Sequence, residues 1–309
     1  MLCAPRIAPA SAAALLAALL AACATAPANA AGAVARTQHE KNSDIVSVKD
    51  FGAQGDGVAN DTLALRAANN SGAGAIFYPP GNYRVTDTIE VKCPQIGTGK
   101  RYAPNAFITM DSATAKNIFI GTGAEVHLSD ITGLAFRSAQ ATKIHTALYG
   151  GGYQIRFADI NILGMNRAAD LDGVYITFED FYIADCTKGV YPAYLRGVYL
   201  LPSTMWELRR GVFFGCVHGF HLENRFGAGQ NEDLINLTFD SVGFEQNTNG
   251  CLLTQRSWNT RVHGCWFEAN TTVSFSGAAS DVLWGANRVD AGDPLPVYCA
   301  PDRKSTRLN

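Results

Sequence analysis

The second half of the chain repeats one short residue pattern at intervals that suit a stacked architecture. The anchor positions hold Asn or Cys and lie 20, 30, 31 and 23 residues apart: Asn166, Cys186, Cys216, Asn247 and Asn270. A bulky apolar residue stands three positions before each anchor: Leu163, Ile183, Phe213, Phe244 and Phe267. Because each turn of a solenoid buries its apolar side chains only against neighbouring turns, this repeat predicts stacked coils.

The offsets within the repeat predict which side chains point inward. A second column lies eight positions before the anchors: Ala158, Phe178, Leu208, Phe239 and Val262. With one coil per repeat, equivalent residues stack about 4.8 Å apart, and the anchors lie at a bend where stacked asparagines can bond along the ladder. A β-sandwich would instead need hairpin turns every 8–12 residues or so. The pattern favours an all-β fold, a right-handed single-stranded parallel β-helix.

Residues 46–91 carry the most specific motif. A short strand over 46–50 is followed by the glycine-rich loop FGAQGDG, and Asn60 or Asp61 can cap a helix over 62–69. Further strands are expected at 75–78, 82–85 and 88–91. The run DFGAQGDGVANDTLALRAA followed by AIFYPPGNYRV resembles the start of the pectate-lyase-like superfamily. Its members include polygalacturonase-related hydrolases, rhamnogalacturonases, alginate epimerases and phage depolymerases.

The resemblance implies a structural role for this motif. In that superfamily the short helix caps the N-terminal end of the β-helix, where core and backbone groups would otherwise be exposed. The family's Asp-Asp-Thr reads Asn60-Asp61-Thr62 here. The polygalacturonase motifs Asn-Thr-Asp, Asp-Asp, Gly-His-Gly and Arg-Ile-Lys are not intact, and the epimerase motif Asp-Pro-His is missing. The resemblance therefore implies a polysaccharide-active class and leaves the reaction open.

Composition and the N-terminus indicate an exported globular protein. Of 309 residues, 47% are apolar and 17% charged, and the net charge of -2 lacks the basic field of a nucleic-acid binder. We expect an export signal over 1–22, a linker over 23–44, the β-helix over 45–301, and a truncated or non-native tail over 302–309. Cys23 follows a lipobox-like Leu-Ala-Ala and is the expected lipidation site, with cleavage near Ala30 as the alternative. The expected location is the outer membrane as a lipoprotein, or the periplasm or medium, with membrane contact only through that anchor.

Two outward columns contain the candidate catalytic groups. One holds Asp159, Glu179, Arg209, Asp240 and His263, and the other holds Gly164, Ala184, Phe214, Glu245 and Glu268. Two carboxylates about 5–9.5 Å apart suit glycoside hydrolysis, and their proximity raises one pKa. We therefore predict Glu245 and Glu268 as the catalytic pair, Asp240 as a further acid, and His263 as a proton shuttle. Arg209 would hold a sugar carboxylate, although a ladder of weak surface ion pairs is the alternative interpretation of these columns.

Other residues supply weaker candidates. Tyr194 and Trp206 lie between two coils, where exposed rings could stack on sugars, unless the loop folds over its own side chains. His218 and His221 are expected at a loop or strand edge. No Cys or His spacing indicates a metal site, and the later cysteines suit small buried positions. No cofactor is expected; for a lyase, Ca²⁺ is an alternative, with oxygen ligands from Asp170, Asp172, Glu179, Asp180 and Asp185.

These observations lead to one functional prediction and two alternatives. The prediction is an exported glycoside hydrolase that cleaves an acidic polysaccharide in a groove formed by Arg209, Asp240, Glu245, His263 and Glu268. A non-catalytic glycan-binding or adhesin-like β-helix is the first alternative, and a polysaccharide lyase or uronate epimerase is the second. The expected partner is a polysaccharide, and a monomer is preferred over a homotrimer.

Overall fold

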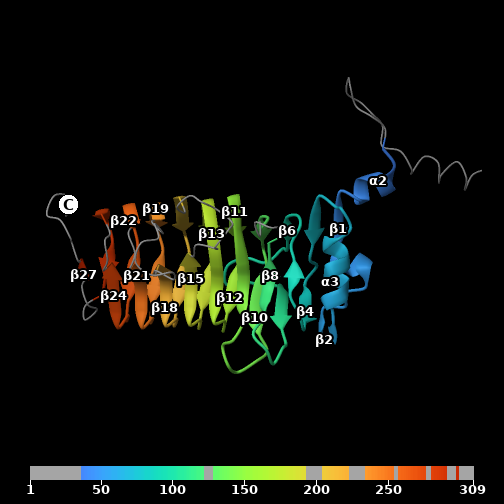
Figure 1. The fold of residues 1–309 in the computed structure, drawn as a ribbon, viewed down its shortest axis with the longest axis horizontal. Helices are drawn as coiled ribbons and strands as arrows, with labels where there is room; N and C mark the ends of the chain where they lie inside the picture. The colour runs from blue at the N-terminus through green and yellow to red at the C-terminus, as the bar shows by residue number, and fades with distance from the viewer. Residues whose placement is uncertain are drawn as a thin grey trace, which may run out of the picture.

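The chain folds into a parallel β-helix, as the repeat predicts. The computed structural model describes residues 36–121, 128–192, 204–222, 234–253, 257–275, 280–290 and 297–298. Strands of successive coils lie side by side in one elongated stack, from the helix α3 (Thr62–Asn69) at one end to the last coils at the other (Figure 1). Neighbouring strands pair in parallel with strands one coil away.

Each coil contributes strands to three faces. The first face precedes a bend and contains β1 (Ile45–Ser47), β3 (Ala75–Phe77), β6 (Gln95–Ile96), β9 (Ile131–Thr132), β16 (Thr204–Arg209), β19 (Leu234–Asp240), β22 (Ser257–His263) and β25 (Ser280–Gly285). The second face contains β2 (Asp56–Asn60), β4 (Gly81–Val85), β7 (Ala106–Met110), β10 (Ala135–Ser138), β12 (Asn161–Leu163), β14 (Tyr182–Ala184), β17 (Val212–Phe214), β20 (Gly243–Glu245), β23 (Trp266–Glu268) and β26 (Arg288–Val289). The third face contains β5 (Ile89–Glu90), β8 (Asn117–Ile120), β15 (Lys188–Pro192), β18 (His218–Leu222), β21 (Asn249–Leu253), β24 (Thr272–Phe275) and β27 (Val297–Tyr298).

Two long strands join the third face to the first. β11 (Thr146–Ala158) pairs with β8 through its first half and with β9 through its second half. β13 (Arg167–Glu179) likewise pairs with β15 and then with β16. One coil therefore runs from the third face to the first and then to the second before the next coil begins.

The predicted inward columns form the core. Phe213, Phe244 and Phe267 are in register on successive coils, with ring centroids 5.3 Å and 5.0 Å apart. All three rings are fully buried. Aromatic stacking adds to the burial of apolar area, so this column stabilises the association of one coil with the next.

The prediction for the coil that contains Asn166 is wrong by one residue. Ile162, not Leu163, is in register with Ile183, and Phe157, not Ala158, is in register with Phe178. Met165 therefore occupies the anchor position. The same shift places Ala158 and Leu163 in the two outward columns, where Asp159 and Gly164 were expected.

The bends explain how a repeated sequence turns three times per coil. From Gly133 onward, the bend between the first and second faces contains a residue with positive φ in each coil. Between the first and second faces they are Gly133, Asp159, Asp180, Arg210, Ser241, Gly264 and Ala286. Positive φ is uncommon outside glycine, so the in-register pairing of the flanking strands imposes this conformation on most coils.

Asparagine bonding at the anchor bend is confirmed. Asn247 accepts from the backbone N–H of Cys216 at 2.9 Å and donates to the carbonyl of Phe213 at 3.0 Å. Asn270 accepts in the same way from the backbone N–H of Asn247 at 3.1 Å. These side chains satisfy backbone groups that would otherwise be buried without partners.

The N-terminal motif forms the expected cap. The helix α3 occupies the predicted residues and buries Leu65 and Ala68 against the first coil. Asp61 does not cap this helix with its side chain; it accepts backbone bonds from Gln54 and Gly55 in the glycine-rich loop. The expected strand over 46–50 ends early, because a 3₁₀ helix occupies Val48–Phe51. A short helix, α2 (Gln38–Asn42), precedes β1.

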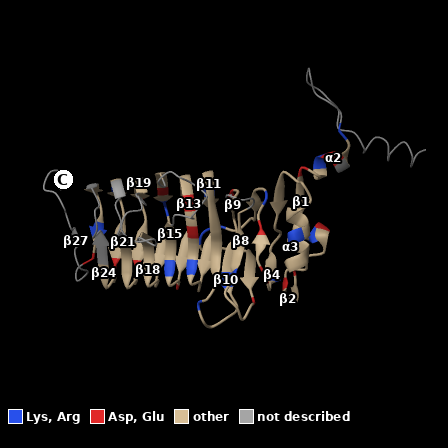
Figure 2. Ribbon diagram, viewed as in Figure 1, with Lys and Arg blue, Asp and Glu red and all other residues tan. Residues whose placement is uncertain are grey.

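The cysteines that the structure describes are small core residues, as predicted. Cys93, Cys186, Cys216, Cys251 and Cys265 are buried free thiols. Charged residues of both signs are sparse along the strands (Figure 2). Within the described ranges, no helix is long and apolar enough to cross a membrane.

Candidate functional site

A groove of about 630 Å³ opens on the first face, over the last coils. Its floor comes from alternate residues of β16, β19, β22 and β25, whose side chains point away from the core because strand residues alternate. Glu207, Thr238, Arg261 and Leu283 are in register on four successive coils. Asp240, His263 and Gly285 form the adjoining column, and Val262 and Trp284 complete the lining. The stack thus brings together residues that are far apart in sequence.

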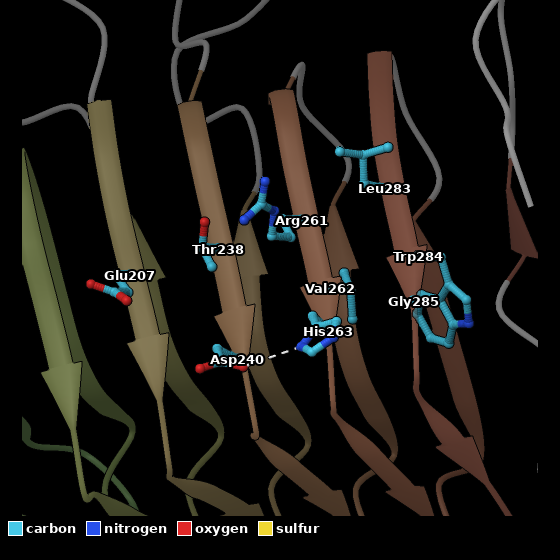
Figure 3. A pocket seen from close by; sticks show the side chains of 9 residues that line it. All are labelled: Glu207, Thr238, Asp240, Arg261, Val262, His263, Leu283, Trp284 and Gly285. Carbon is cyan, nitrogen blue, oxygen red and sulfur yellow. Dashed lines mark hydrogen bonds and ion pairs between the residues drawn. The ribbon is translucent and has the colours of Figure 1, made fainter. Parts of the chain in front are cut away.

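An imidazole and a carboxylate face each other within this groove. Nδ1 of His263 lies 3.4 Å from Oδ1 of Asp240, across the neighbouring strands β19 and β22 (Figure 3). Both side chains are about half exposed, at 59% and 46%. A carboxylate next to one ring nitrogen orients the imidazole and leaves the other nitrogen for proton transfer.

The groove also contains a cation. Arg261 is exposed beside His263 and makes no ion pair with another residue in the part of the chain that the structure describes. Its planar guanidinium can bind a carboxylate through two parallel hydrogen bonds. Glu207 lies two coils away in the same column, so the groove presents both signs of charge to a ligand.

Arg209 lies in the predicted column, but its guanidinium is already engaged. It pairs with Glu179 at 2.9 Å and approaches Glu207 at 3.6 Å. Burial alone would raise the pKa of Glu179, but hydrogen bonds from Arg209 and Arg156 outweigh it and lower that pKa to about 2. These ion pairs fit the alternative interpretation of a charge ladder, and Arg261 instead of Arg209 supplies the cation that lines the groove.

The predicted glutamate pair exists, but on a different face. Glu245 and Glu268 are in register on β20 and β23. Ser241, with φ of 57°, turns the chain onto the second face after Asp240, so neither glutamate lines the groove. Burial raises the pKa of Glu245, and the neighbouring Glu268 carboxylate raises it further. This pair has the property expected of a general acid, but it lies outside the groove that was expected to contain it.

The aromatic prediction for Trp206 is wrong in its placement. Trp206 lies within β16 and is only 1% exposed, and its indole N–H donates to the carbonyl of Gly173 at 3.0 Å. It faces the interior because strand alternation places it between the outward residues Met205 and Glu207. Tyr194 and Cys23 lie outside the described residues.

The residues proposed as calcium ligands do not converge. Asp170 pairs with Arg167, Glu179 and Asp180 pair with Arg210, and Asp185 pairs with Lys143. Among the described residues, no group of three or more His, Cys, Asp or Glu side chains is arranged to hold a metal ion.

Sequence reasoning missed Glu207, Thr238 and Arg261, although a signal for them was present. They stand nine positions before Cys216, Asn247 and Asn270, two residues before the charged column that was singled out. Because alternation in a strand makes both offsets outward, the same argument covers this second column.

The fold and the first coils define the class of protein. The family model described as "Rhamnogalacturonase A/epimerase, pectate lyase-like" matches residues 45–103. WceF of Pantoea stewartii, a glycan biofilm modifying enzyme with a tailspike-like parallel β-helix, superposes with a TM-score of 0.61 at 15% identity, over 84% of this chain and 39% of that one. Residues 45–103 thus match the pectate lyase/rhamnogalacturonase/epimerase-like family, and the described chain shares the parallel β-helix fold of such proteins.

Two further comparisons concern a curated relative and a solved structure. Alginate lyase 7 of Azotobacter vinelandii is 48% identical over 211 residues, which cover 66% of this chain and 20% of that protein. The chain thus spans a fifth of the length of this curated relative. PfbA, a surface adhesin of Streptococcus pneumoniae, has a TM-score of 0.57 at 14% identity, over 82% of this chain and 74% of that one. At that identity the likeness concerns the fold alone.

Proposed function

We propose that this chain acts on an acidic polysaccharide bound in the groove, by abstracting the proton next to a uronate carboxylate. The observation that carries this proposal is the His263–Asp240 pair, 3.4 Å apart, beside the exposed Arg261 in a groove of about 630 Å³. A cleft of that size accommodates a small ligand, such as a short stretch of a sugar chain. The arrangement supplies a base, a group that orients it, and a cation for the substrate.

The proposed step follows from the charges. Arg261 binds the sugar carboxylate and stabilises the negative charge that develops when the adjacent C–H bond breaks. His263 accepts that proton, and Asp240 stabilises the resulting imidazolium. In elimination, the freed electron pair forms a carbon–carbon double bond and expels the glycosidic oxygen, which takes up a proton from water. In epimerisation, water supplies a proton to the same carbon from the opposite side, and His263 then releases its proton to solvent.

The comparisons support an acidic substrate without fixing the reaction. The matching family model includes lyase-like and epimerase proteins in its description, and one relative is an alginate lyase. Both elimination and epimerisation begin with the same proton abstraction, so one site serves either outcome.

The test is product analysis on defined polymers. The chain is incubated with polymannuronate, polygalacturonate and a neutral glucan, and three signals are followed: unsaturated uronate absorbance, new reducing ends, and inversion at the carbon beside the carboxylate by NMR. The proposal expects unsaturation or inversion on an acidic polymer only, and its loss in Arg261→Gln. Glycan binding with none of these signals would contradict catalysis and favour the adhesin-like alternative.

Glycoside hydrolysis remains the second candidate, and one observation favours it. The pKa of Glu245 is raised by burial and by the adjacent Glu268, which would hold a proton ready for the glycosidic oxygen. Reducing ends without unsaturation, abolished by Glu245→Gln and by Glu268→Gln but not by Arg261→Gln, would place the reaction on the second face.

A further inference from the structure

Two buried cysteines occupy the same position on neighbouring coils. Cys186 and Cys216 lie at the bend between the second and third faces, in the column that holds Asn247 and Asn270 on the next two coils. The flanking strands are in register, β14 with β17 before the bend and β15 with β18 after it. Within the bend, the backbone N–H of Val217 donates to the carbonyl of Cys186 at 2.9 Å. The backbones of the two cysteines are therefore one strand spacing apart, about 4.8 Å.

The thiols take the place of asparagine in this column, but they bond the backbone more weakly. Asn247 donates to the carbonyl of Phe213 at 3.0 Å. At the equivalent place one coil earlier, Sγ of Cys216 lies 3.7 Å from the carbonyl oxygen of Ile183. A thiol is only a weak donor and a weak acceptor, so the contact between these two coils lacks the stronger side-chain bonds that the asparagines supply on the next coils.

The two side chains meet inside the bend. They are 0% and 1% exposed, and in the structure both are thiols. A hydrogen bond with the Cys186 thiol lowers the pKa of Cys216, whereas burial raises the pKa of Cys186. A disulfide requires Cα atoms between about 4.4 and 6.8 Å apart, and one strand spacing meets that requirement. Cys216 is the thiol that ionises more readily, which makes it the attacking group.

We propose that Cys186 and Cys216 are a modification site, at which a small disulfide oxidant such as oxidised glutathione creates a disulfide bond between two coils. The Cys216 thiolate attacks one sulfur of oxidised glutathione, which gives a mixed disulfide and releases one glutathione thiolate. The Cys186 thiolate then attacks the Cys216 sulfur and releases the second glutathione. The two cysteine protons pass to the two glutathione thiols, so two thiols are oxidised and one disulfide is reduced.

Burial determines when this bond forms. An oxidant does not reach the two thiols in the folded chain, so the reaction takes place during folding, before the two coils close on each other. The two cysteines are 30 residues apart, and a bond that closes such a loop restricts the unfolded chain and stabilises the folded one. It also joins the coil that carries Glu207 of the groove to the preceding coil. This inference concerns the stack itself and needs no ligand, so it goes beyond the function proposed above.

The test is peptide mapping of the full chain after refolding with and without an oxidant. The chain is refolded from urea in a mixture of reduced and oxidised glutathione, and in parallel with a reducing phosphine. Free thiols are then alkylated, and mass spectrometry of the unreduced digest identifies linked peptides. A peptide pair joined through Cys186 and Cys216 is expected in the oxidised sample only. That sample should also melt at a temperature higher by about 5–10 °C, as for a closed loop of this length.

Two variants show whether this pair causes the shift in melting temperature. Cys216→Asn replaces the thiol with the side chain that Asn247 places on the next coil, so it should fold, and its melting temperature should not depend on the oxidant. Cys265→Ala is the matched control, because Cys265 is also a buried thiol at a bend, but its in-register neighbour is Val242. That variant should keep the full shift.

The outcomes decide the inference without any substrate. Alkylation of both Cys186 and Cys216 in the oxidised sample would overturn it, and so would a link from either residue to another cysteine. A shift that persists in Cys216→Asn would also overturn it, since another pair would then be the cause. Should Cys216→Asn fail to refold by circular dichroism, Cys186→Ala takes its place with the same expected loss of the shift. A negative result leaves the function proposed for the groove standing, because none of these measurements involves the groove.

Discussion

The groove on the first face lies on coils that overlap with a cluster of charged and aromatic side chains on the third face, yet the charges of the two regions differ in burial. We call this second group the third-face cluster: Arg167, Asp170, Lys188, Tyr191, His218 and His221. In the groove, Asp240 and His263 are half exposed and face each other at 3.4 Å. In the third-face cluster, Asp170 is fully buried and held by Arg167. An outward position on a strand therefore does not by itself determine whether a charged side chain is exposed or buried. We expect that removing a charge from the groove abolishes function and changes the free energy of unfolding little. Removing a buried charge from the cluster should lower the free energy of unfolding.

The largest effect is expected from His263→Gln. Loss of a general base lowers the rate of proton abstraction by about 10²- to 10⁴-fold, and removal of an exposed side chain changes the free energy of unfolding by less than about 0.5 kcal/mol. Initial rates on an acidic polymer and urea unfolding measure the two quantities. A stable variant with an unchanged rate would show that the groove is not the active site.

Asp170→Asn should show the reverse pattern in stability. Removing the charge of this fully buried carboxylate weakens its hydrogen bond with the partly exposed Arg167, which costs about 1–3 kcal/mol of unfolding free energy. Asp240→Asn is the matched control on the groove face, with a cost below about 1 kcal/mol. Urea unfolding measures both variants. Equal losses of unfolding free energy would contradict the proposed difference between the two faces.

Glu179 lies between these two extremes and predicts a pH dependence. Its pKa is lowered from 4.5 to about 2, because the hydrogen bonds from Arg209 and Arg156 outweigh its burial. The stability it contributes is therefore present above pH 4.5 and is lost as the pH falls toward 2, by at most about 3 kcal/mol. In Glu179→Gln, the free energy of unfolding should therefore depend less on pH between these two values. If the free energy of unfolding of that variant still falls with pH as steeply as before, other carboxylates cause the acid sensitivity.

The smallest effect concerns the carboxylate pair on the second face. A methyl group at Gly243 would lie 2.8 Å from Oε1 of Glu245 and would displace that flexible carboxylate toward water. Gly243→Ala should therefore move the raised pKa of Glu245 back toward its ordinary value, with a change in stability below about 1 kcal/mol. NMR titration of the carboxyl groups measures the pKa of Glu245. A pKa that does not fall would mean that burial at this position is not its cause.

The sequence was sufficient for the stacked columns from Cys186 onward, because the distance from an inward residue to the next bend is the same in each coil. It failed at Asn166 because the amide resembles Asn247 and Asn270, whereas Met165 holds the equivalent position. Bend geometry, and not the chemistry of the side chain, decides which residue is in register.

The site was only half predictable for a related reason. Alternation correctly gives Asp240, His263, Glu245 and Glu268 as outward, but the turn at Ser241 assigns the first two and the last two to different faces. Burial is equally hidden, because Trp206 packs against a segment that is distant in sequence, where its indole N–H donates to the carbonyl of Gly173. A single sequence contains the order of the strands and little about these contacts.

The most direct test of the account is a crystal structure of the His263→Gln variant with a bound uronate hexamer. The account predicts the sugar chain on the first face, with one carboxylate hydrogen-bonded to Arg261 and the adjacent carbon facing residue 263. A hexamer that lies instead along Glu245 and Glu268, with the groove empty, would contradict it.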